Sequence, residues 1–278
     1  MKKITRRSFL AAAGLTAAAL ALTACGGSAS STASSTASSA ASSEAASSSA
    51  AAELTTVEAG KLTMATNAAF PPYEMTTDSG EIEGIDVDTA KAIAEKLGLE
   101  LQIDDMDFDA ALLSVQQGKA DIVMAGVTVT DERKAVMDFS DSYATGIQSI
   151  IVPEGSDITS PDDLAGKKIG TQRGTTGYIY CSDDFGDDAV VAYDDGLTAV
   201  QALKNGQVDA VVIDNAPAKE FVAANPGLVI LDTSYAEEDY AIGMAKGSAL
   251  EDAVNAALEE LKADGTLQSI VDKYITAE

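Results

Sequence analysis

Arg133 stands where a protein could hold a small carboxylate. It follows a short apolar run, residues 122–125, that is typical of a strand buried on both faces. Gly126 ends the run, and Thr130 is a candidate N-cap for a helix whose third residue would be Arg133. A guanidinium at the carboxyl end of a buried strand suits an anionic ligand. The alternative is a surface arginine that pairs with a nearby carboxylate of Asp131, Asp138 or Asp141.

Two other stretches carry groups that complement this arginine. Residues 173–177 join a predicted strand to a helix start that contains Thr175 and Thr176, and free N–H groups at a helix N-terminus attract anions. Asp214 follows the predicted strand 208–213 and would supply an anion for an ammonium group. Its alternative role is the N-cap of the next helix. Together these groups indicate a site for an α-amino acid, with a carboxylate clamp made by Arg133 and the helix start.

The elements that must position these groups alternate between strand and helix from residue 57 onwards. This order predicts an α/β fold with two mainly parallel sheets. Ligands of such sheets bind at the carboxyl ends of the strands, where Asn67, Phe70 and Thr128 also lie, with Phe108 at a helix start. For both phenylalanines, a place in the hydrophobic core is the alternative. Asp86 and Asp88 are expected to be structural helix caps.

An internal repeat divides the folded part in two. At an offset of 88 residues, from Gly118 to Gly206, each copy is expected to contain a helix, a glycine stop and a buried strand. Gly126 and Asp214 then occupy equivalent strand ends. With two candidate crossing strands, residues 147–152 and 240–245, the repeat predicts two lobes that face each other across a cleft.

Composition excludes several classes of function. Of 278 residues, 18 are basic and 44 acidic, for a net charge of -26, so nucleic acid and anionic lipid surfaces are poor partners. Histidine is absent, which excludes histidine-based catalysis and histidine metal sites. The two cysteines, Cys25 and Cys181, are too few for a disulfide framework or a cysteine-rich zinc site. We therefore expect no metal and no cofactor.

The first 56 residues are predicted to direct export and membrane anchoring and not to form part of the folded domain. Residues 1–24 have a basic start and an apolar core, which predicts an export signal. The last of them, with Cys25, resemble a bacterial lipobox, which implies cleavage before Cys25 and lipidation of its sulfur. Arg6 and Arg7 also fit a twin-arginine signal. Residues 25–56 are mostly Ser, Ala, Thr and Gly, and therefore predict a flexible tether behind the lipid anchor.

Residues 57–278 resemble the extracellular solute-binding proteins of family 3, the polar amino acid receptors of ABC importers. The resemblance is carried by residues 65–73, 84–88, 106–108, 126–133, 138–140, 174–177 and 208–210. It implies a two-lobed, type II periplasmic-binding-protein-like fold with two crossing strands. Lobe 1 would comprise residues 57–147 and 242–278, and lobe 2 residues 148–241.

The same resemblance implies a role for each site residue. Arg133 and the Thr176 amide would bind the ligand carboxylate, with Thr175 beside them. Asp214, Thr128 and the Gly126 carbonyl would receive the ammonium group. Phe70 and Phe108 would enclose the side chain, and no residue would be catalytic. Relatives that bind cationic side chains often carry an acid where this chain has Asn67. Asn67 thus favours a neutral polar ligand, although Glu74 or Asp107 could still serve a basic one.

The implied function is that of a monomeric receptor, lipid-anchored outside the cell membrane. It would bind a free polar L-amino acid and deliver it to the permease subunits of an ABC importer. Two alternatives remain open: an enzyme similar to cyclohexadienyl dehydratases on the same fold, and a ligand-binding sensory module. An enzyme would need a general acid or base in the cleft, for which Asp214 and Glu74 are candidates.

Overall fold

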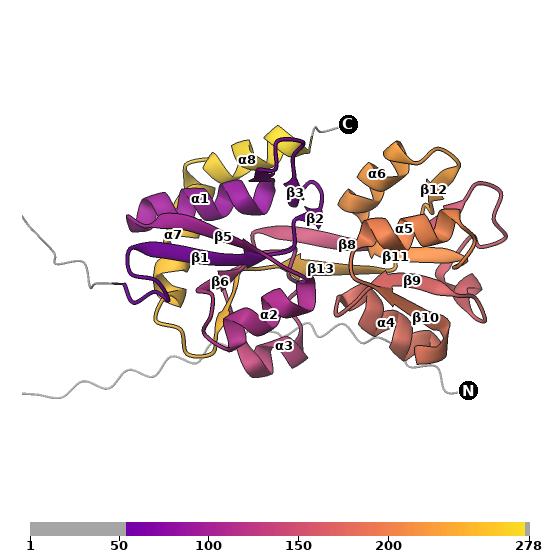
Figure 1. The fold of residues 1–278 in the computed structure, drawn as a ribbon, viewed down its shortest axis with the longest axis horizontal. Coiled ribbons are helices and arrows are strands. Elements are labelled where there is room, and N and C mark those ends of the chain that lie inside the picture. Colours follow the sequence, from indigo (N-terminus) through magenta and orange to yellow (C-terminus); the bar gives the residue numbers. More distant parts are fainter. Residues whose placement is uncertain (1–53, 276–278) are drawn as a thin grey trace, which may run out of the picture. The chain divides into compact units, whose positions relative to one another are not determined.

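The computed structural model describes residues 54–275, so the predicted signal segment, Cys25 and most of the predicted tether lie outside the described range. Within that range the chain forms two large sheets and one small sheet. Figure 1 shows the large sheets side by side, with helices on their faces and the strands β8 and β13 running between them. The predicted two-lobed α/β fold is confirmed.

The first large sheet contains β1 (Lys61–Thr66) at the centre of its parallel part. Its order is β5-β1-β6-β14-β7. The other strands are β5 (Glu100–Asp105), β6 (Ile122–Val123), β14 (Gly243–Ala245) and β7 (Met137–Phe139). β1 pairs in parallel with β5 and β6, whereas β14 runs antiparallel to β6 and β7. The sheet is therefore mixed, because β14 enters from the other lobe.

The second large sheet has the order β10-β9-β11-β8-β12. Its strands are β8 (Ala144–Pro153), β9 (Ile169–Gln172), β10 (Val190–Tyr193), β11 (Ala210–Asp214) and β12 (Leu228–Ile230). β9 pairs in parallel with β10 and β11, but β8 runs antiparallel to β11 and β12. This sheet is also mixed, whereas the sequence predicted mainly parallel sheets, because the crossing strand β8 is built into it.

The two strands that join the lobes pair with each other. β13 (Ala236–Tyr240) lies antiparallel to β8 from Ala144 to Gln148. The predicted second crossing strand, residues 240–245, was placed too late in the chain. The crossing strand itself includes three consecutive acids, residues 237–239, which are poor strand formers. Their pairing with β8 overrides that preference, and residues 243–245 belong to the first sheet instead.

The predicted internal repeat is present in the structure. Helix α2 (Phe108–Gln116) and helix α5 (Gly196–Lys204) have the same length and lie 88 residues apart. Asp121 and Asp209, which are equivalent in the repeat, make equivalent bonds. The Asp121 carboxylate accepts the N–H of Thr63 at 2.8 Å, and the Asp209 carboxylate accepts the N–H of Lys168 at 2.7 Å. Each acid thus ties its own strand to the neighbouring strand of its sheet.

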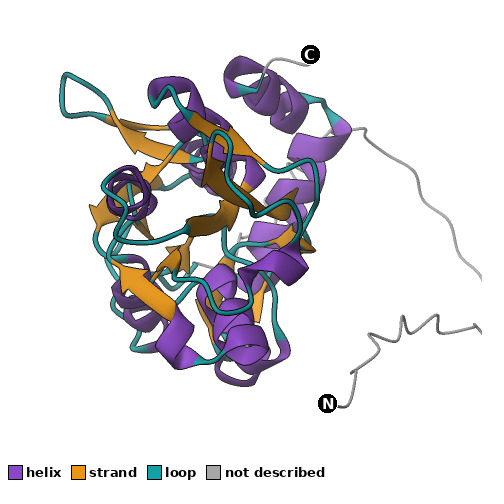
Figure 2. Cartoon of the chain, turned by 90° about the vertical axis from the view of Figure 1, so that its right-hand side faces the viewer, coloured by secondary structure: helices purple, strands orange, loops and turns teal. Residues whose placement is uncertain are grey.

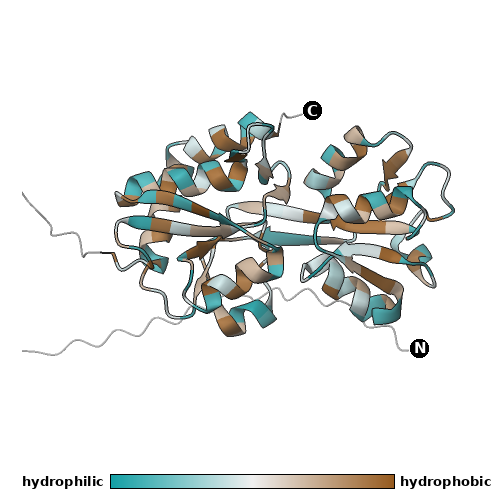
Figure 3. Ribbon diagram, in the orientation of Figure 1, coloured by the Kyte–Doolittle hydropathy of each residue, from teal (hydrophilic) through white to brown (hydrophobic). Residues whose placement is uncertain are grey.

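The remaining helices cover the sheets. Around the first sheet are α1 (Ile85–Leu97), α3 (Asp131–Val136), α7 (Glu251–Ala263) and α8 (Thr266–Tyr274). Around the second are α4 (Thr176–Phe185), α6 (Asn215–Ala224) and the short 3-10 turns Pro161–Leu164 and Asp187–Ala189. In Figure 2 the strands run through the middle of the described chain and the helices lie outside them. Figure 3 shows helices that are apolar on one side and polar on the other, as packing on a sheet requires.

A small hairpin sheet projects beside the carboxyl end of β1. Its strands are β2 (Ala69–Phe70), β3 (Glu74–Thr76) and β4 (Ile82–Glu83). Gly84, with φ 141, lets α1 begin directly against this hairpin, because a Cβ there would overlap the Tyr73 carbonyl. This close backbone contact fixes β3 against α1, and therefore fixes the direction in which Glu74 points.

Candidate functional site

A narrow pocket with a cavity volume of about 10 Å³ lies between the two lobes at the strand ends. All nine residues that the sequence predicts for ligand binding line it: Asn67, Phe70, Phe108, Gly126, Thr128, Arg133, Thr175, Thr176 and Asp214. Three further residues complete the lining: Glu74, Ala125 and Gln172. The structure thus brings the predicted set together, and their contact with a solute stays a prediction.

Arg133 is held inside the pocket rather than on the surface. The Thr130 hydroxyl caps α3 by accepting the Arg133 N–H at 3.1 Å, as predicted. The guanidinium is part of a residue only 8% exposed, and it donates to the Thr128 carbonyl at 2.8 Å and the Gly174 carbonyl at 3.1 Å. Its carbon lies 5.4 Å from the centre of the Phe108 ring, a cation–π contact. The surface-pairing alternative for Arg133 is therefore wrong.

The N-terminus of α4 faces this guanidinium from the other lobe. Thr175 is its N-cap and accepts the Tyr178 N–H at 3.3 Å, and Thr176 is the first helical residue. The N–H groups of a first helical turn have no partner within the helix. Because the Arg133–Gly174 bond brings the two anion-binding groups together, a carboxylate between them would meet both.

Asp214 ends β11 on the opposite side of the pocket. Its carboxylate accepts hydrogen bonds from the Tyr240 hydroxyl and from Nε2 of Gln148, the latter at 2.7 Å. It makes no side-chain cap to α6, so the capping alternative is wrong. The pKa of Asp214 is raised to about 6, chiefly by burial and to a smaller extent by nearby Glu238, while the two hydrogen bonds oppose the shift. The carboxylate is thus an anion kept in place at some electrostatic cost.

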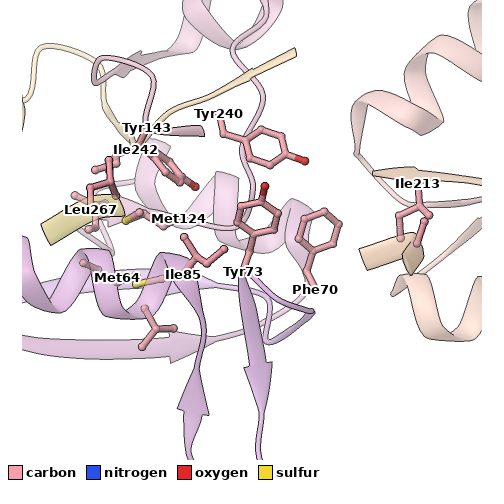
Figure 4. Packing of buried hydrophobic residues seen from close by; sticks show 14 of the residues in the cluster. Met64, Phe70, Tyr73, Ile85, Met124, Tyr143, Ile213, Tyr240, Ile242 and Leu267 are labelled. Carbon is pink, nitrogen blue, oxygen red and sulfur yellow. The ribbon is translucent and has the colours of Figure 1, made fainter. Parts of the chain in front are cut away.

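Phe70 and Phe108 belong both to the pocket and to the core. Figure 4 shows Tyr73 between Phe70 and Tyr240. The Phe70 and Tyr73 rings stack at 5.8 Å, and Tyr73 meets Tyr240 edge-on at 5.3 Å. Phe108 packs with the apolar residues under the first sheet and beneath Arg133. Each ring is therefore fixed by core packing while one part of it borders the pocket.

Asn67 bridges the lobes through its amide. Its Oδ1 accepts a hydrogen bond from Nε2 of Gln172 at 2.8 Å, and its Nδ2 donates to the Met106 carbonyl at 3.0 Å. Both ends of the amide are therefore engaged within the described chain. Gln172, which follows the same pattern of strand-end residues, was not selected from the sequence.

Glu238 is the main polar residue that the sequence analysis missed. Its carboxylate accepts hydrogen bonds from four side chains: Thr176 at 2.8 Å, Tyr180 at 2.6 Å, Gln148 at 3.2 Å and Thr128 at 3.3 Å. Two of these donors, Thr128 and Thr176, are predicted site residues on opposite lobes. Within β13, Glu238 and Tyr240 are buried while Glu237 and Asp239 are exposed, but three consecutive acids show no such alternation in the sequence.

Asp86 and Asp88 are not helix caps. Helix α1 begins after Gly84 with no side-chain cap. The Asp86 carboxylate instead accepts the Gly126 N–H at 3.0 Å and the Tyr143 hydroxyl at 2.7 Å. Asp88 accepts from Lys273 at 2.7 Å and from Tyr274 at 2.9 Å, which ties α1 to α8. The two carboxylates therefore bind donors from elsewhere in the chain and not the free N–H groups at the start of α1.

Residues 54–275 contain no group of three or more acids and cysteines placed to hold a metal ion. Nor does any helix in this range have the length and apolar character needed to cross a membrane. Cys181 is buried in α4, and burial raises the pKa of its thiol to about 12. A thiol in that state is not a nucleophile.

Two α/β lobes joined by paired strands, with a charged pocket between them, define a solute-binding protein. The chain belongs to the bacterial extracellular solute-binding proteins, family 3, whose model matches residues 62–277. It is a binding protein rather than an enzyme.

Among its relatives is a probable histidine-binding protein of Neisseria gonorrhoeae, 33% identical over 96% of this chain and 95% of the relative. The L-cystine-binding protein TcyJ of Escherichia coli is also 33% identical, over 80% of this chain and 85% of TcyJ. A solved structure with a similar fold is the arginine-, lysine-, histidine-binding protein ArtJ of Geobacillus stearothermophilus. It has a TM-score of 0.75 and 35% identity, covering 78% of this chain and 96% of ArtJ.

The buried acids predict that mild acid stabilises the ligand-free protein. The pKa of Asp86 and that of Asp214 are each raised to about 6, chiefly by burial. The folded state therefore binds protons that the unfolded chain releases above about pH 4. Lowering the pH from 7.5 to 5 should raise the free energy of unfolding by about 1 kcal/mol for each group. Urea denaturation followed by circular dichroism measures this.

The matched control is Asp78→Asn, at an exposed position in the hairpin turn. This variant should keep the full pH dependence, whereas Asp214→Asn should lose only the share that comes from Asp214, about 1 kcal/mol. A free energy of unfolding that is unchanged or lower at pH 5 would contradict the prediction.

Proposed function

We propose that the protein is an extracytoplasmic, membrane-anchored receptor that binds a polar L-amino acid between its lobes and delivers it to an ABC importer. The observation that supports this best is the opposition of Arg133 and the α4 N-terminus across one pocket that also contains Asp214. A cationic clamp and a separate buried carboxylate match the two charged groups of an α-amino acid.

The hydrogen bonds around the pocket support the following orientation of the ligand. The ligand carboxylate binds the Arg133 guanidinium and the N–H of Thr176. The ammonium group donates to Asp214, to the Gly126 carbonyl and to the Thr128 hydroxyl. Because the Thr128 hydroxyl donates to Glu238, which can only accept when ionised, its lone pairs remain for the ammonium group.

We further propose that the ligand has a cationic side chain. The named ligands of the relatives include amino acids with cationic and with uncharged side chains. The charge of the ligand side chain is therefore inferred from the residues that line the pocket. Arg133 and Asp214 are matched by the ligand's own carboxylate and ammonium, which leaves Glu74 as a buried acid in the pocket lining. Asp107, the other acid considered from the sequence, is exposed and does not line the pocket. Glu74 therefore outweighs the preference for a neutral ligand that Asn67 suggests.

Transport requires that the lobes close over the solute. Hydrogen bonds that join them across the pocket include Arg133 to Gly174 and Gln172 to Asn67, and the Thr128 and Thr176 hydroxyls lie 3.4 Å apart. The paired strands β8 and β13 provide the hinge, and the closed form is the one presented to the permease. The ligand shifts the balance between forms only by its differential affinity for the closed one.

Removal of the clamp should abolish most of the affinity. Arg133→Ala leaves the ligand carboxylate buried without its charged partner, at a cost of about 2–5 kcal/mol. Isothermal titration should show a loss of roughly thirtyfold to several thousandfold. Arg173→Ala is the matched control, because that side chain is 52% exposed and pairs with Asp194 on the surface. Binding by Arg133→Ala within about threefold of the wild type would refute the assignment.

The ligand class is tested by comparing arginine with citrulline, which has the same length but an uncharged side chain. The wild type should bind arginine at least about tenfold more tightly, since a charge-assisted hydrogen bond contributes roughly 1.5–3 kcal/mol. Glu74→Gln should remove this preference, and Asp107→Asn should keep it. Equal affinity of the wild type for both amino acids would exclude a cationic ligand class.

The proposed location rests on Cys25 and the apolar segment before it. Lipidated Cys25 would hold the protein at the outer face of the membrane, with residues 26–56 as the tether. Cys25→Ser should move the protein from the membrane fraction to the soluble extracytoplasmic fraction, with unchanged amino acid affinity. Retention of this variant in the membrane fraction would show that the anchor lies elsewhere.

A further inference from the structure

Two carboxyl groups meet in the wall of the pocket without an opposing cation. Glu74 on β3 and Asp86 on α1 are both 0% exposed. The two carboxyl groups interact with each other, and Glu74 lines the pocket whereas Asp86 is not part of its lining. Two carboxylates at this distance and depth repel strongly, so the pair is expected to keep a proton.

The donors around the pair decide which oxygen carries that proton. Asp86 accepts the Gly126 N–H and the Tyr143 hydroxyl, and both bonds favour its charged form. Neither oxygen of Glu74 has a donor among the described residues outside this pair. The proton therefore belongs on Glu74, whose hydroxyl can donate to Asp86.

The other groups that face the pair are acids and phenols. They are Asp105 at the end of β5, Asp214 at the end of β11, Tyr73 before β3 and Tyr143 before β8. Arg133, the cation of the pocket lining, gives its hydrogen bonds to Thr128 and Gly174. Burial and the neighbouring acids raise the pKa of Glu74 well above its ordinary value, and burial raises that of Asp86 to about 6.

We propose that a cationic ligand side chain displaces the proton shared by Glu74 and Asp86, so that capture of the amino acid releases one proton to solvent. This inference rests on the proposed cationic ligand class. The balance is simple: the O–H bond of Glu74 breaks, its proton leaves to water, and the ligand cation takes its place beside the two carboxylates. The total charge in the pocket wall is unchanged by the exchange.

The coupling has a definite sign. While the free pair keeps its proton and the complex has lost it, a rise of one pH unit tightens arginine binding by about tenfold. The window opens above the pKa of the pair in the complex and closes above the pKa of Glu74 in the free protein, which burial raises well above its ordinary value. Citrulline has no side-chain charge to displace the proton, and its affinity should change far less over the same range.

Isothermal titration at pH 7.5 measures the coupling directly. Arginine and citrulline are each titrated into the wild type in phosphate and in Tris, which differ in their heat of protonation. The difference in binding heat between the buffers gives the protons released. We expect about one proton more for arginine than for citrulline. This comparison also subtracts any proton released by Asp214, because both ligands carry the same ammonium group.

The variants separate the possible outcomes. Glu74→Gln should bind arginine more weakly and without the extra proton, whereas Asp107→Asn should match the wild type. Tight arginine binding by the wild type with the same proton count as citrulline would overturn the coupling and leave the proposed function standing. Failure of the wild type to bind any amino acid would overturn the proposed function, and the coupling with it.

Discussion

The structure depends on a guanidinium that is buried between two lobes. A buried cation without partners costs several kcal/mol, so the fold must supply acceptors from both sides. Thr128 offers a carbonyl from the loop that leads into α3, and Gly174 offers one from the start of α4 in the other lobe. A carbonyl carries only a partial charge, so neither replaces an anion. The lobes can therefore meet at Arg133, and the proposed ligand carboxylate would supply the missing anion.

The buried carboxyl groups in the same region are accommodated in three different ways. Asp214 receives two hydrogen bonds, Glu238 receives four, and Glu74 with Asp86 keeps a proton. For Asp214, Asp86 and Glu74, whose pKa values are raised chiefly by burial, the buried acid lowers the stability of the ligand-free state above pH 6. The proposed ligand, with one carboxylate and two cationic groups, would relieve this excess. Binding and stability are thus linked through the same few carboxyl groups.

Features that depend on a local sequence pattern or on the internal repeat could be predicted from the sequence. Thr130, Arg133 and Thr176 stand at helix starts, and the repeat related Gly126 to Asp214, so one pocket was predictable from strand ends. Glu238 was missed because its partners come from three other segments, and its strand forms only by pairing with β8. Asp86 was misjudged for a related reason: its donors, Gly126 and Tyr143, are distant in the chain, and no local pattern indicates them.

The two equivalent strand ends of the repeat, Gly126 and Asp214, differ in their side chains and in their surroundings. In the second lobe the acid, Asp214, is part of the strand itself. In the first lobe the position is Gly126, and a Cβ there would come within 2.7 Å of the Phe70 ring and 3.3 Å of the Tyr240 ring. The acid next to Gly126 is supplied by α1 instead, since Asp86 binds its N–H. The absence of a side chain at this one strand end leaves room for the aromatic rings of Phe70 and Tyr240.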